Sequence, residues 1–350
     1  MMQAGMAWLT ASFHEPRGLL YHGGAVAYAV LAWGFGLAGL FSPHWAVNLA
    51  ATLLLAHGMV IAAYMIHECG HNTVFRSNQS NARLGRALNW IAGSAYGTFE
   101  DIRYKHFRHH MDNDDVVWWQ YGPFFATHPR VYRVTRLLEW FYIPAHELIM
   151  HGIMMFTSFV IPQRRGQRVH NVTVILVRGG IFLLVLIMFP KAAVLYFIAT
   201  MLMIHVLRLM DSTHHDYGPN PTLYAQQPAS RFGGRAAEQD HTFSCPLSLR
   251  FERLNWLVLN FGFHNAHHAR PTIPWYRLPA WDRKKFGTDA CRFIPFSSQL
   301  RMYHRFRVCR VMHEGGPYDA EQDLMGKDYL QACKDMRNYG GNAVSFLTSF

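Results

Sequence analysis

The sequence has few charged residues. Asp, Glu, Lys and Arg make up 16% of its 350 residues, whereas hydrophobic residues make up 51%. A typical soluble domain carries about 25% charged residues. The apolar residues also occur in long runs instead of at the spacing of amphipathic helices. These features exclude an ordinary soluble globular domain and indicate a membrane protein.

Cysteine is scarce as well, and several cofactor motifs are absent. The five cysteines, an odd number, include no Cys-x2-Cys pair, which excludes a disulfide framework and a rubredoxin-like iron site. The sequence contains neither a Gly-rich dinucleotide-binding loop nor a haem-binding His-Pro-Gly-Gly segment. Any electrons that the protein uses are therefore expected to come from another molecule.

The net charge of +11 is accompanied by no recognised nucleic-acid-binding motif. Lys and Arg are dispersed along the chain, with Arg283-Lys284-Lys285 as their only compact cluster. We expect these cations to meet anionic lipid head groups, and we expect no nucleic-acid partner.

The first apolar run is not preceded by the basic region and the small-residue cleavage pattern of a signal peptide. We therefore expect that run to remain as an anchor.

Four apolar runs are long enough to cross roughly 30 Å of hydrocarbon as helices. They form two pairs, residues 24–41 with 45–66 and residues 172–189 with 192–210. Each pair is interrupted by a short break, Ser42-Pro43-His44 in the first and Pro190-Lys191 in the second. The pattern predicts an all-α membrane protein with four transmembrane helices in two hairpins.

A further apolar stretch, Leu137–Ile161, carries four ionisable residues, Glu139, His146, Glu147 and His151. Such groups are expensive at the bilayer centre, so we expect an interfacial or re-entrant helix instead of a fifth span. Leu254–Phe263 is consistent with another amphipathic helix lying on the membrane, although a core helix of a cytoplasmic domain would look the same.

The distribution of basic residues predicts the orientation. Of the 33 Lys and Arg residues, only Lys191 lies in the short loops between paired spans, whereas Arg178 and Arg208 lie close enough to the ends of the second pair to snorkel. The positive-inside rule therefore places both termini, residues 67–171 and everything after Met210 in the cytoplasm. We predict a membrane region at 1–210, with hairpins at about 24–66 and 172–210, and a cytoplasmic histidine-rich cap with a C-terminal tail at 211–350.

Histidine, in contrast, is clustered. Three clusters are present, His67-Glu-Cys-Gly-His71, His106-Phe-Arg-His109-His110 and His264-Asn-Ala-His267-His268. Imidazoles three or four positions apart project from the same face of a helix and can converge on a metal. Because these histidines are too many for one ion, the clusters predict a polynuclear site for a metal that imidazole suits, such as Fe, Zn, Cu or Ni.

The clusters are expected to meet at the cytoplasmic surface of the membrane, which places the metal site on that side. The first follows the second span, the second lies between the hairpins, the third lies in the cap, and the fourth span ends in Asp211-Ser-Thr-His214-His215. A metal at this depth can reach an acyl chain lifted from the bilayer. The nearby aromatic residues Trp118, Trp119 and Tyr121 would either wall a substrate tunnel or form an interfacial belt.

Glu68 gives the first cluster the His-Glu-x-x-His pattern of zinc proteases, in which the glutamate acts as a general base. A membrane zinc protease is therefore one alternative, and a non-enzymatic metal or haem carrier is another. A catalytic zinc takes three protein ligands, so the protease would leave the second and third clusters unused. The number of histidines favours two metal ions.

The order of the three clusters resembles the integral-membrane fatty acid desaturase and hydroxylase superfamily. The first cluster looks like the usual first box of that family, and residues 260–274, around the third, are similar to its sphingolipid and acyl-lipid desaturase branch. The resemblance covers about residues 45–280. It implies a fatty acyl desaturase, in which two non-haem irons activate O2 to remove two hydrogens from an acyl chain. A hydroxylase, ketolase or epoxidase of the superfamily is the alternative, because the boxes do not separate these activities.

The resemblance also implies which residues bind the irons. The family's motif matches eight residues: His67, His71, His106, His109, His110, His264, His267 and His268. Family members add a ligand at the end of the fourth span, where His214 and His215 are both candidates and His215 is favoured. The family further requires a separate electron donor, of ferredoxin, rubredoxin or cytochrome type, in addition to the lipid or acyl substrate.

Several residues near the clusters remain open to two interpretations. His241 is either a further ligand or a hydrogen-bonded structural histidine. Asp112, Asp114 and Asp115 either accept N–H bonds from ligand imidazoles, which would fix the orientation of those rings, or form a solvated acidic turn. Asp211 is a further candidate for holding a ligand ring.

Overall fold

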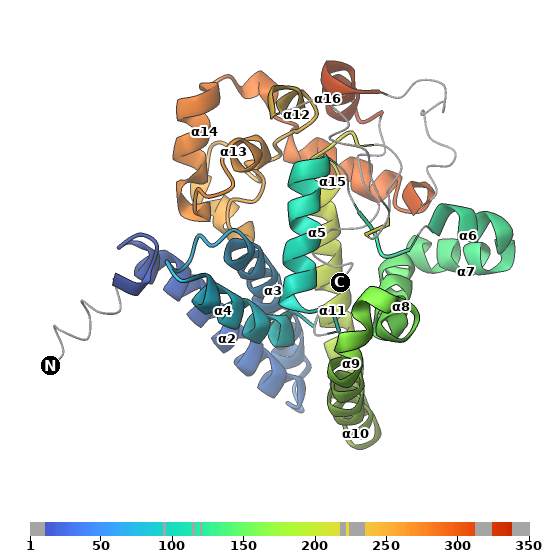
Figure 1. The fold of residues 1–350 in the computed structure, drawn as a ribbon. Coiled ribbons are helices and arrows are strands. Elements are labelled where there is room, and N and C mark those ends of the chain that lie inside the picture. The colour runs from blue at the N-terminus through green and yellow to red at the C-terminus, as the bar shows by residue number, and fades with distance from the viewer. Residues whose placement is uncertain are drawn as a thin grey trace, which may run out of the picture. The chain divides into compact units, whose positions relative to one another are not determined.

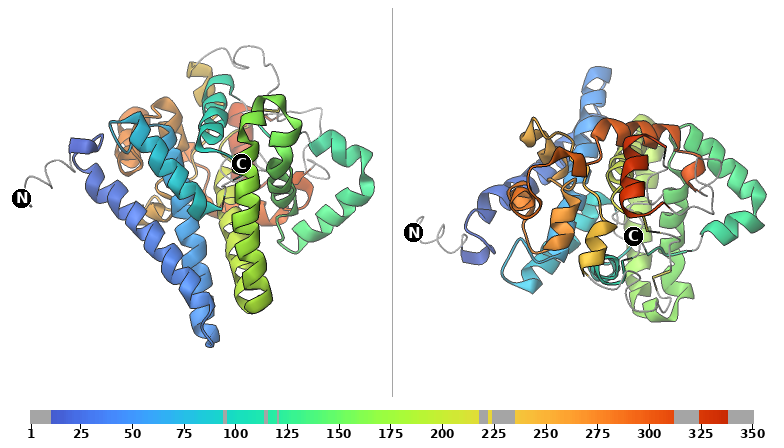
Figure 2. Two further views of the ribbon diagram at one scale, coloured as in Figure 1. Left: turned by 60° about the horizontal axis from the view of Figure 1, so that its bottom comes forward. Right: turned by 90° about the horizontal axis from the view of Figure 1, so that it is seen from above.

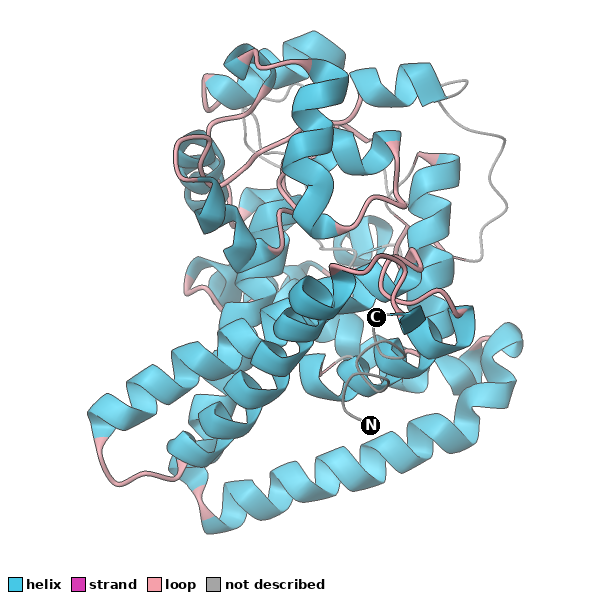
Figure 3. Ribbon diagram, turned by 90° about the vertical axis from the view of Figure 1, so that its left-hand side faces the viewer, coloured by secondary structure: helices cyan, strands magenta, loops and turns pink. Residues whose placement is uncertain are grey.

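A computed structural model describes residues 11–93, 96–113, 116–119, 121–217, 222–223, 235–311 and 324–337. Regular structure in these ranges is helical, and β pairing is limited to isolated bridges (Figure 3). The helices of the first half are α2 (Gly18–Leu40), α3 (Trp45–Gly70), α4 (Asn78–Ala92), α5 (Phe99–Asp112), α6 (Tyr121–Thr127), α7 (Pro129–Trp140) and α8 (Ala145–Val160) (Figure 1). The predicted all-α class is confirmed.

The second half is built in the same way. Its α-helices are α9 (Arg168–Val174), α10 (Gly180–Met188), α11 (Pro190–Asp211), α12 (Arg235–Asp240), α13 (His264–Ala269), α14 (Leu278–Phe286), α15 (Phe296–Arg305) and α16 (Gly326–Lys334). Shorter helical turns are η1 (Pro162–Gln167), η2 (Ile175–Gly179), η3 (Glu252–Val258), η4 (Trp275–Arg277), η5 (Ala290–Arg292) and η6 (Cys309–Val311).

Four helical segments are long and apolar enough to span a membrane, as predicted. They are Gly18–Leu40, Trp45–Gly70, Pro162–Met188 and Pro190–Asp211. The second segment is longer than the predicted run at 45–66, so that His67 lies within the last turn of α3 and not beyond it. The third segment begins ten residues before the predicted run at 172 and includes η1, α9, η2 and α10.

The chain divides into two compact units that are each discontinuous in sequence. One consists of Met1–Arg103 with His151–Ile204, and the other of Tyr104–Met150 with His205–Ser349. Helices α5, α8 and α11 each contribute residues to both units. This division differs from a boundary at residue 210. The functional division into a membrane region at 1–210 and a cap at 211–350 stays a prediction.

In the first unit, α2 and α3 pack against each other through small residues (Figures 1 and 2). A Cβ atom built on Gly36 would lie 2.7 Å from Cβ of Leu55, and one built on Gly39 would lie 2.6 Å from Cβ of Ala51. Because neither glycine has room for a side chain, the two backbones can approach closely, as is common for helices that pack in membranes.

The third membrane segment is a single rod in Figure 2, although its helical pitch changes. Its central turn η2 is π-helical and carries Arg178. We expected Arg178 to snorkel past the end of the span. Instead its guanidinium donates a hydrogen bond to Tyr196 Oη at 3.2 Å and lies 5.9 Å from the ring of Trp90. The charge is therefore held by polar and aromatic groups of the protein.

The stretch Leu137–Ile161, which we expected to form an interfacial or re-entrant helix, is two helices. The chain breaks between the end of α7 at Trp140 and the start of α8 at Ala145. Tyr142 in this break has a φ of 60°, in the left-handed region, and Pro144 cannot donate the backbone hydrogen bond that would continue a helix. α8 has 16 residues and is not among the four membrane segments.

Glu139, one of the ionisable residues of this region, is paired inside the protein. Glu139 accepts a hydrogen bond from the backbone N–H of His146 at 3.0 Å and pairs with Arg208 at 3.1 Å. Both side chains of the ion pair are buried. The expectation that Arg208 snorkels to the head groups is therefore wrong, because a carboxylate from α7 neutralises it within the fold.

The expected amphipathic helix at Leu254–Phe263 is also not formed. The segment is the 3₁₀ turn η3, followed by Leu259 and Asn260 in left-handed conformations with φ of 44° and 57°. The side-chain amide of Asn260 donates to the carbonyl of Trp275 at 2.9 Å. This turn redirects the chain immediately before α13, which carries the third histidine cluster.

Candidate metal centre

The second histidine cluster lies on α5, where positions three and four apart share one face. His106, His109 and His110 therefore project together, and the ring centroids of His106 and His110 are 4.5 Å apart. Arg108, between them, pairs with Asp112 at 2.6 Å and donates to the carbonyl of Leu223. The pair with Asp112 lies within α5, whereas the contact with Leu223 joins the helix to another segment of the second unit.

The third cluster lies on the short helix α13, which is held by close backbone contacts. The backbone N–H of Cys245 donates to the carbonyl of Gly262 at 2.8 Å, and a Cβ on Gly262 would lie only 2.4 Å from the Cys245 carbonyl oxygen. Only glycine permits this approach. Asn265, inside the cluster, accepts a hydrogen bond from the Ser244 hydroxyl at 2.9 Å and thereby fixes the first turn of α13.

Four imidazoles of the second unit converge on one point. His109, His215, His264 and His268 each offer one ring nitrogen, and these nitrogens lie within 4.8 Å of one another. Nε2 of His215 is 2.8 Å from Nε2 of His264, and Nε2 of His109 is 3.2 Å from Nε2 of His268. All four residues are buried. This group is suited to hold a metal ion, because four ring nitrogens this close together can all coordinate the same cation.

The opposite nitrogen of two of these rings is held by an acceptor. Nδ1 of His268 is 2.6 Å from a carboxylate oxygen of Glu238, and Nδ1 of His215 is 3.2 Å from the backbone carbonyl of His241. Since these oxygens can only accept, Nδ1 carries the proton in both rings. Nε2 is then left as the lone-pair nitrogen that a metal requires.

A second set of imidazoles lies beside the first in the same unit. Nε2 of His110 is 3.1 Å from Nε2 of His106 and 3.1 Å from Nε2 of His267. His110 also belongs, with Glu238 and His268, to a group whose candidate ligand atoms lie within 4.8 Å of one another. Two adjacent sets of donors are what a two-metal centre requires.

The first cluster is described within the first unit. His67 and His71 lie at the end of α3 with ring centroids 4.8 Å apart. The carboxylate of Glu68 lies 3.8 Å from Nδ1 of His67 and accepts a hydrogen bond from the Thr73 hydroxyl at 2.6 Å. Glu68 is thus positioned to orient the His67 ring.

Burial keeps four of the candidate histidines, His214, His215, His264 and His268, neutral. Loss of solvent lowers the pKa of His214 to about 3, with a further contribution from His109. Burial, followed by the neighbouring imidazoles, also lowers the pKa of His215, His264 and His268 well below the ordinary value of 6.5. Neutral imidazole is the form that binds a metal, so the rings need not lose a proton on binding at neutral pH.

The two histidines after the fourth span have different surroundings. His215 belongs to the four-imidazole group, whereas His214 does not. The His214 ring stacks on His264 at 4.1 Å with an interplanar angle of 13°, and its Nδ1 lies 3.9 Å from the Asp211 carboxylate. That distance is too long for a hydrogen bond, and the role of Asp211 in holding a ligand ring stays a prediction.

Other candidates lie outside the groups of possible ligands. The His241 ring belongs to no such group among the described residues, and its Nδ1 pairs with the Asp216 carboxylate at 2.9 Å. Asp112 pairs with Arg108 instead of with a ligand imidazole, so the structure gives no support for its predicted role. Asp114 and Asp115 lie outside the described residues. Whether His241 binds a metal stays untested.

The candidate tunnel residues are aromatic contacts of the second unit. Trp118 and Tyr121 are buried. The Tyr121 ring lies 4.1 Å from the ring of His146, and the Trp119 ring lies 4.6 Å from that of Phe124. No described pocket connects these rings with the histidines, so their role in a tunnel stays a prediction.

Sequence reasoning missed Glu238, the carboxylate that holds His268. The residue lies 30 positions before its partner, on the six-residue helix α12. A weak signal was available, because Glu238 precedes His241 by about one helical turn, but Asp240 in the same segment was an equal candidate. Nothing in the sequence indicated which ring it would meet.

Comparison with protein families decides the class. The model of the family described as fatty acid desaturase matches residues 43–292, which is more than half of the chain. The chain belongs to the fatty acid desaturase family. Comparisons with the curated proteins and with the solved structures found no match.

Membership of the fatty acid desaturase family bears on the choice between the alternatives that the histidine clusters leave open. The matched range contains all three histidine clusters, His214, His215, His241 and Glu238. It gives no support to the zinc-protease interpretation of His67-Glu-x-x-His71, because the family that matches is that of the fatty acid desaturases. The chain is a membrane protein of this family with histidine groups that can hold metal.

Proposed function

We propose that this chain is an O2-dependent desaturase that holds two non-haem irons on histidine and introduces a C=C bond into a lipid acyl chain. The observation that carries the proposal is the buried group of His109, His215, His264 and His268 in a chain of the fatty acid desaturase family. A purely imidazole group suits iron, although it also suits other transition metals. The family match favours iron.

The proposed ligands are those that the sequence indicated, with one choice made. We assign His215 in preference to His214, because Nε2 of His215 lies 2.8 Å from Nε2 of His264. The remaining ligands are His67, His71, His106, His109, His110, His264, His267 and His268. We assign His241 a supporting role, since its carbonyl accepts from His215 and its ring pairs with Asp216.

The two irons, when bound, would supply the activation of O2 and the abstraction of hydrogen from an unactivated C–H bond. The protein's own residues hold the ligand rings still. Glu238 and the carbonyl of His241 keep the protons of His268 and His215 on Nδ1. The burial of the group keeps bulk water away from it, which limits side reactions with solvent.

The same account includes three proposals about the surroundings. The apolar segments give an acyl chain a route from the bilayer. An external ferredoxin, rubredoxin or cytochrome would supply electrons, and the net charge of +11 would suit an acidic donor. The excess of Lys and Arg outside the short loops favours a cytoplasmic location for the site and both termini.

Product analysis separates desaturation from oxygenation. The full-length chain, expressed with an electron donor in a host of known lipid content, should yield acyl chains lighter by two hydrogens when extracts are analysed by mass spectrometry. The His109→Ala variant should yield none. Products heavier by one oxygen, with no loss of hydrogen, would instead identify a hydroxylase and contradict the proposed reaction.

A further inference from the structure

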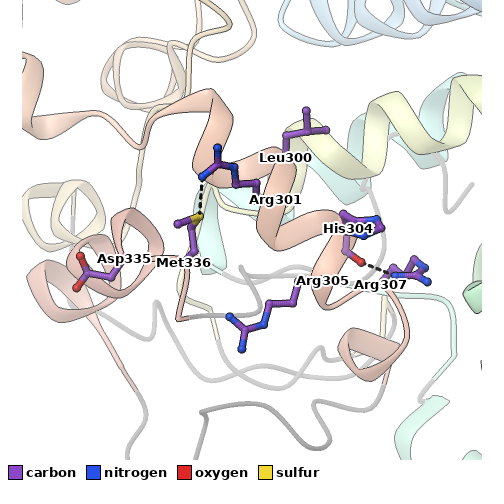
Figure 4. Close-up of a pocket in the computed structure, with 7 residues that line it drawn as sticks. All are labelled: Leu300, Arg301, His304, Arg305, Arg307, Asp335 and Met336. Carbon is purple, nitrogen blue, oxygen red and sulfur yellow. Dashed lines mark hydrogen bonds between the residues drawn. The ribbon is translucent and has the colours of Figure 1, made fainter.

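A basic pocket lies in the second unit, in a part of the chain that the family match at 43–292 does not include. Its volume is ≈ 680 Å³, and it is lined by Leu300, Arg301, His304, Arg305, Arg307, Asp335 and Met336 (Figure 4). The size is that of a small-molecule site. Three of the seven residues are arginines.

The arginines of this pocket have no carboxylate partner among the described residues. The Arg301 guanidinium donates to the sulfur of Met336 at 4.0 Å, and that of Arg305 lies 5.1 Å from the ring of Phe306. Asp335 is the one acidic lining residue, and its carboxylate is already paired with Arg337 at 2.9 Å. The pocket therefore carries positive charge that the described side chains leave uncompensated.

One of the three guanidinium groups is fixed in advance. Arg307 donates to the carbonyl of Trp140 at 3.2 Å and to that of His304 at 2.8 Å. Its guanidinium also lies 4.9 Å from the ring of Tyr142, whose hydroxyl is hydrogen-bonded to His304. A guanidinium held in this way loses little freedom when an anion binds.

The surroundings indicate a lipid instead of a soluble anion. Trp140 and Phe141, which directly precede Tyr142, are 55% and 60% exposed. Exposed aromatic residues of this kind are typical of the head-group level of a membrane protein. The apolar lining residues Leu300 and Met336 can contact the glycerol and first methylenes of a lipid, while the arginines contact its phosphate.

We propose that this pocket binds the phosphate group of a phospholipid. Arginine is the side chain best matched to phosphate, because its planar guanidinium can donate two parallel hydrogen bonds to two oxygens. The proposal does not depend on the desaturase reaction. If the proposed function also holds, the site identifies a phospholipid as a molecule that the enzyme can retain beside its metal-binding unit.

The test is calorimetric titration of the purified full-length protein in detergent with three probes: dihexanoyl phosphatidylglycerol, dihexanoylglycerol and inorganic phosphate. The first should bind, the second should not, and the third should bind at least about tenfold more weakly than the first. Equal binding of dihexanoylglycerol would overturn the proposal, because recognition would then not involve phosphate. Inorganic phosphate binding as tightly as the phospholipid would overturn the lipid source.

Charge variants test the site itself. R301Q/R305Q should weaken phospholipid binding about tenfold or more, since two phosphate-directed guanidinium groups are lost. The matched control R250Q/R253Q removes the same charge from exposed arginines of the same unit and should leave binding unchanged. Equal losses in both pairs, or no loss in the first, would contradict the assignment. Because no turnover is measured, these outcomes are independent of the proposed reaction.

Discussion

Glu238 shows how one residue outside the histidine clusters controls a candidate ligand. Its carboxylate is buried and lies 2.6 Å from Nδ1 of His268. A charged acceptor at this position raises the basicity of the ring and fixes its orientation. His215 has only a backbone carbonyl, that of His241, as its acceptor. Of these two rings, His268 is therefore the one whose metal affinity can be changed by a substitution of its acceptor.

The first prediction concerns this contact. Glu238→Gln keeps the size of the side chain but removes its charge, so the affinity for iron should fall about 10- to 100-fold. The measurement is competition between the protein and a calibrated iron chelator. Glu252→Gln, which removes an exposed carboxylate paired with Arg283, should leave the affinity unchanged. An unaltered affinity in Glu238→Gln would show that the His268 ring is held by other contacts.

At the scale of elements, the α2–α3 pair depends on glycine. In Gly36→Ala the new Cβ would lie 2.7 Å from Cβ and 2.9 Å from Cα of Leu55, so the backbones must separate. We expect a loss of about 1–3 kcal/mol in the free energy of unfolding. Gly34→Ala is the matched control on the same helix, because its Cβ would meet nothing within 4 Å. Thermal unfolding in detergent should show a lower Tm for the first variant only.

The junction of α7 with α11 rests on the Glu139–Arg208 ion pair, which is almost fully buried. Glu139→Gln leaves the Arg208 guanidinium in the interior without its counter-charge. Removing one partner of a buried pair costs about 3–5 kcal/mol, and the Tm should fall accordingly. Glu100→Gln breaks an exposed pair with Arg86 and should cost less than about 1 kcal/mol. Equal effects would mean that Arg208 is solvated.

The sequence predicts those elements that depend on local composition, and it does not predict those that depend on contacts between distant segments. Apolar runs predicted the four spans because length and composition alone decide them. The break at Tyr142 and the left-handed turn at Leu259 and Asn260 depend on contacts with distant segments, such as the bond from Asn260 to Trp275. The Glu139–Arg208 pair joins residues 69 positions apart. No local pattern indicates such contacts.

The same limit applies to the candidate site. Histidine spacing predicted that His109, His264 and His268 converge, because the helical period brings residues three and four apart onto one face. The choice between His214 and His215 needed coordinates, since adjacent residues point in different directions. Glu238 needed them as well, because α12 and α13 are brought together only by the fold.

At the scale of the whole molecule, the buried histidines make the iron-free protein sensitive to acid. Burial lowers the pKa of His215, His264 and His268 well below 6.5, and that of His214 to about 3. Below pH 6.5 these histidines are therefore protonated in the unfolded chain but stay neutral in the folded chain. Stability is fully present above pH 6.5 and is lost as the pH falls from 6.5 toward 3.

This dependence can be measured on protein treated with a chelator. The Tm should be lower at pH 5 than at pH 6.5 and should change little between pH 6.5 and 8. A Tm that stays constant from pH 8 to 5 would mean that the imidazoles are solvated or paired with carboxylates. Such a result would contradict the neutral, buried cluster.

The central claim is that histidines from separate parts of the chain hold two irons, and metal analysis of the purified protein tests it most directly. The full-length chain should contain two irons and no stoichiometric zinc. His109→Ala should contain less iron, whereas His128→Ala, which removes an exposed histidine of the same unit, should retain two. One zinc per chain, or two irons in His109→Ala, would contradict the account.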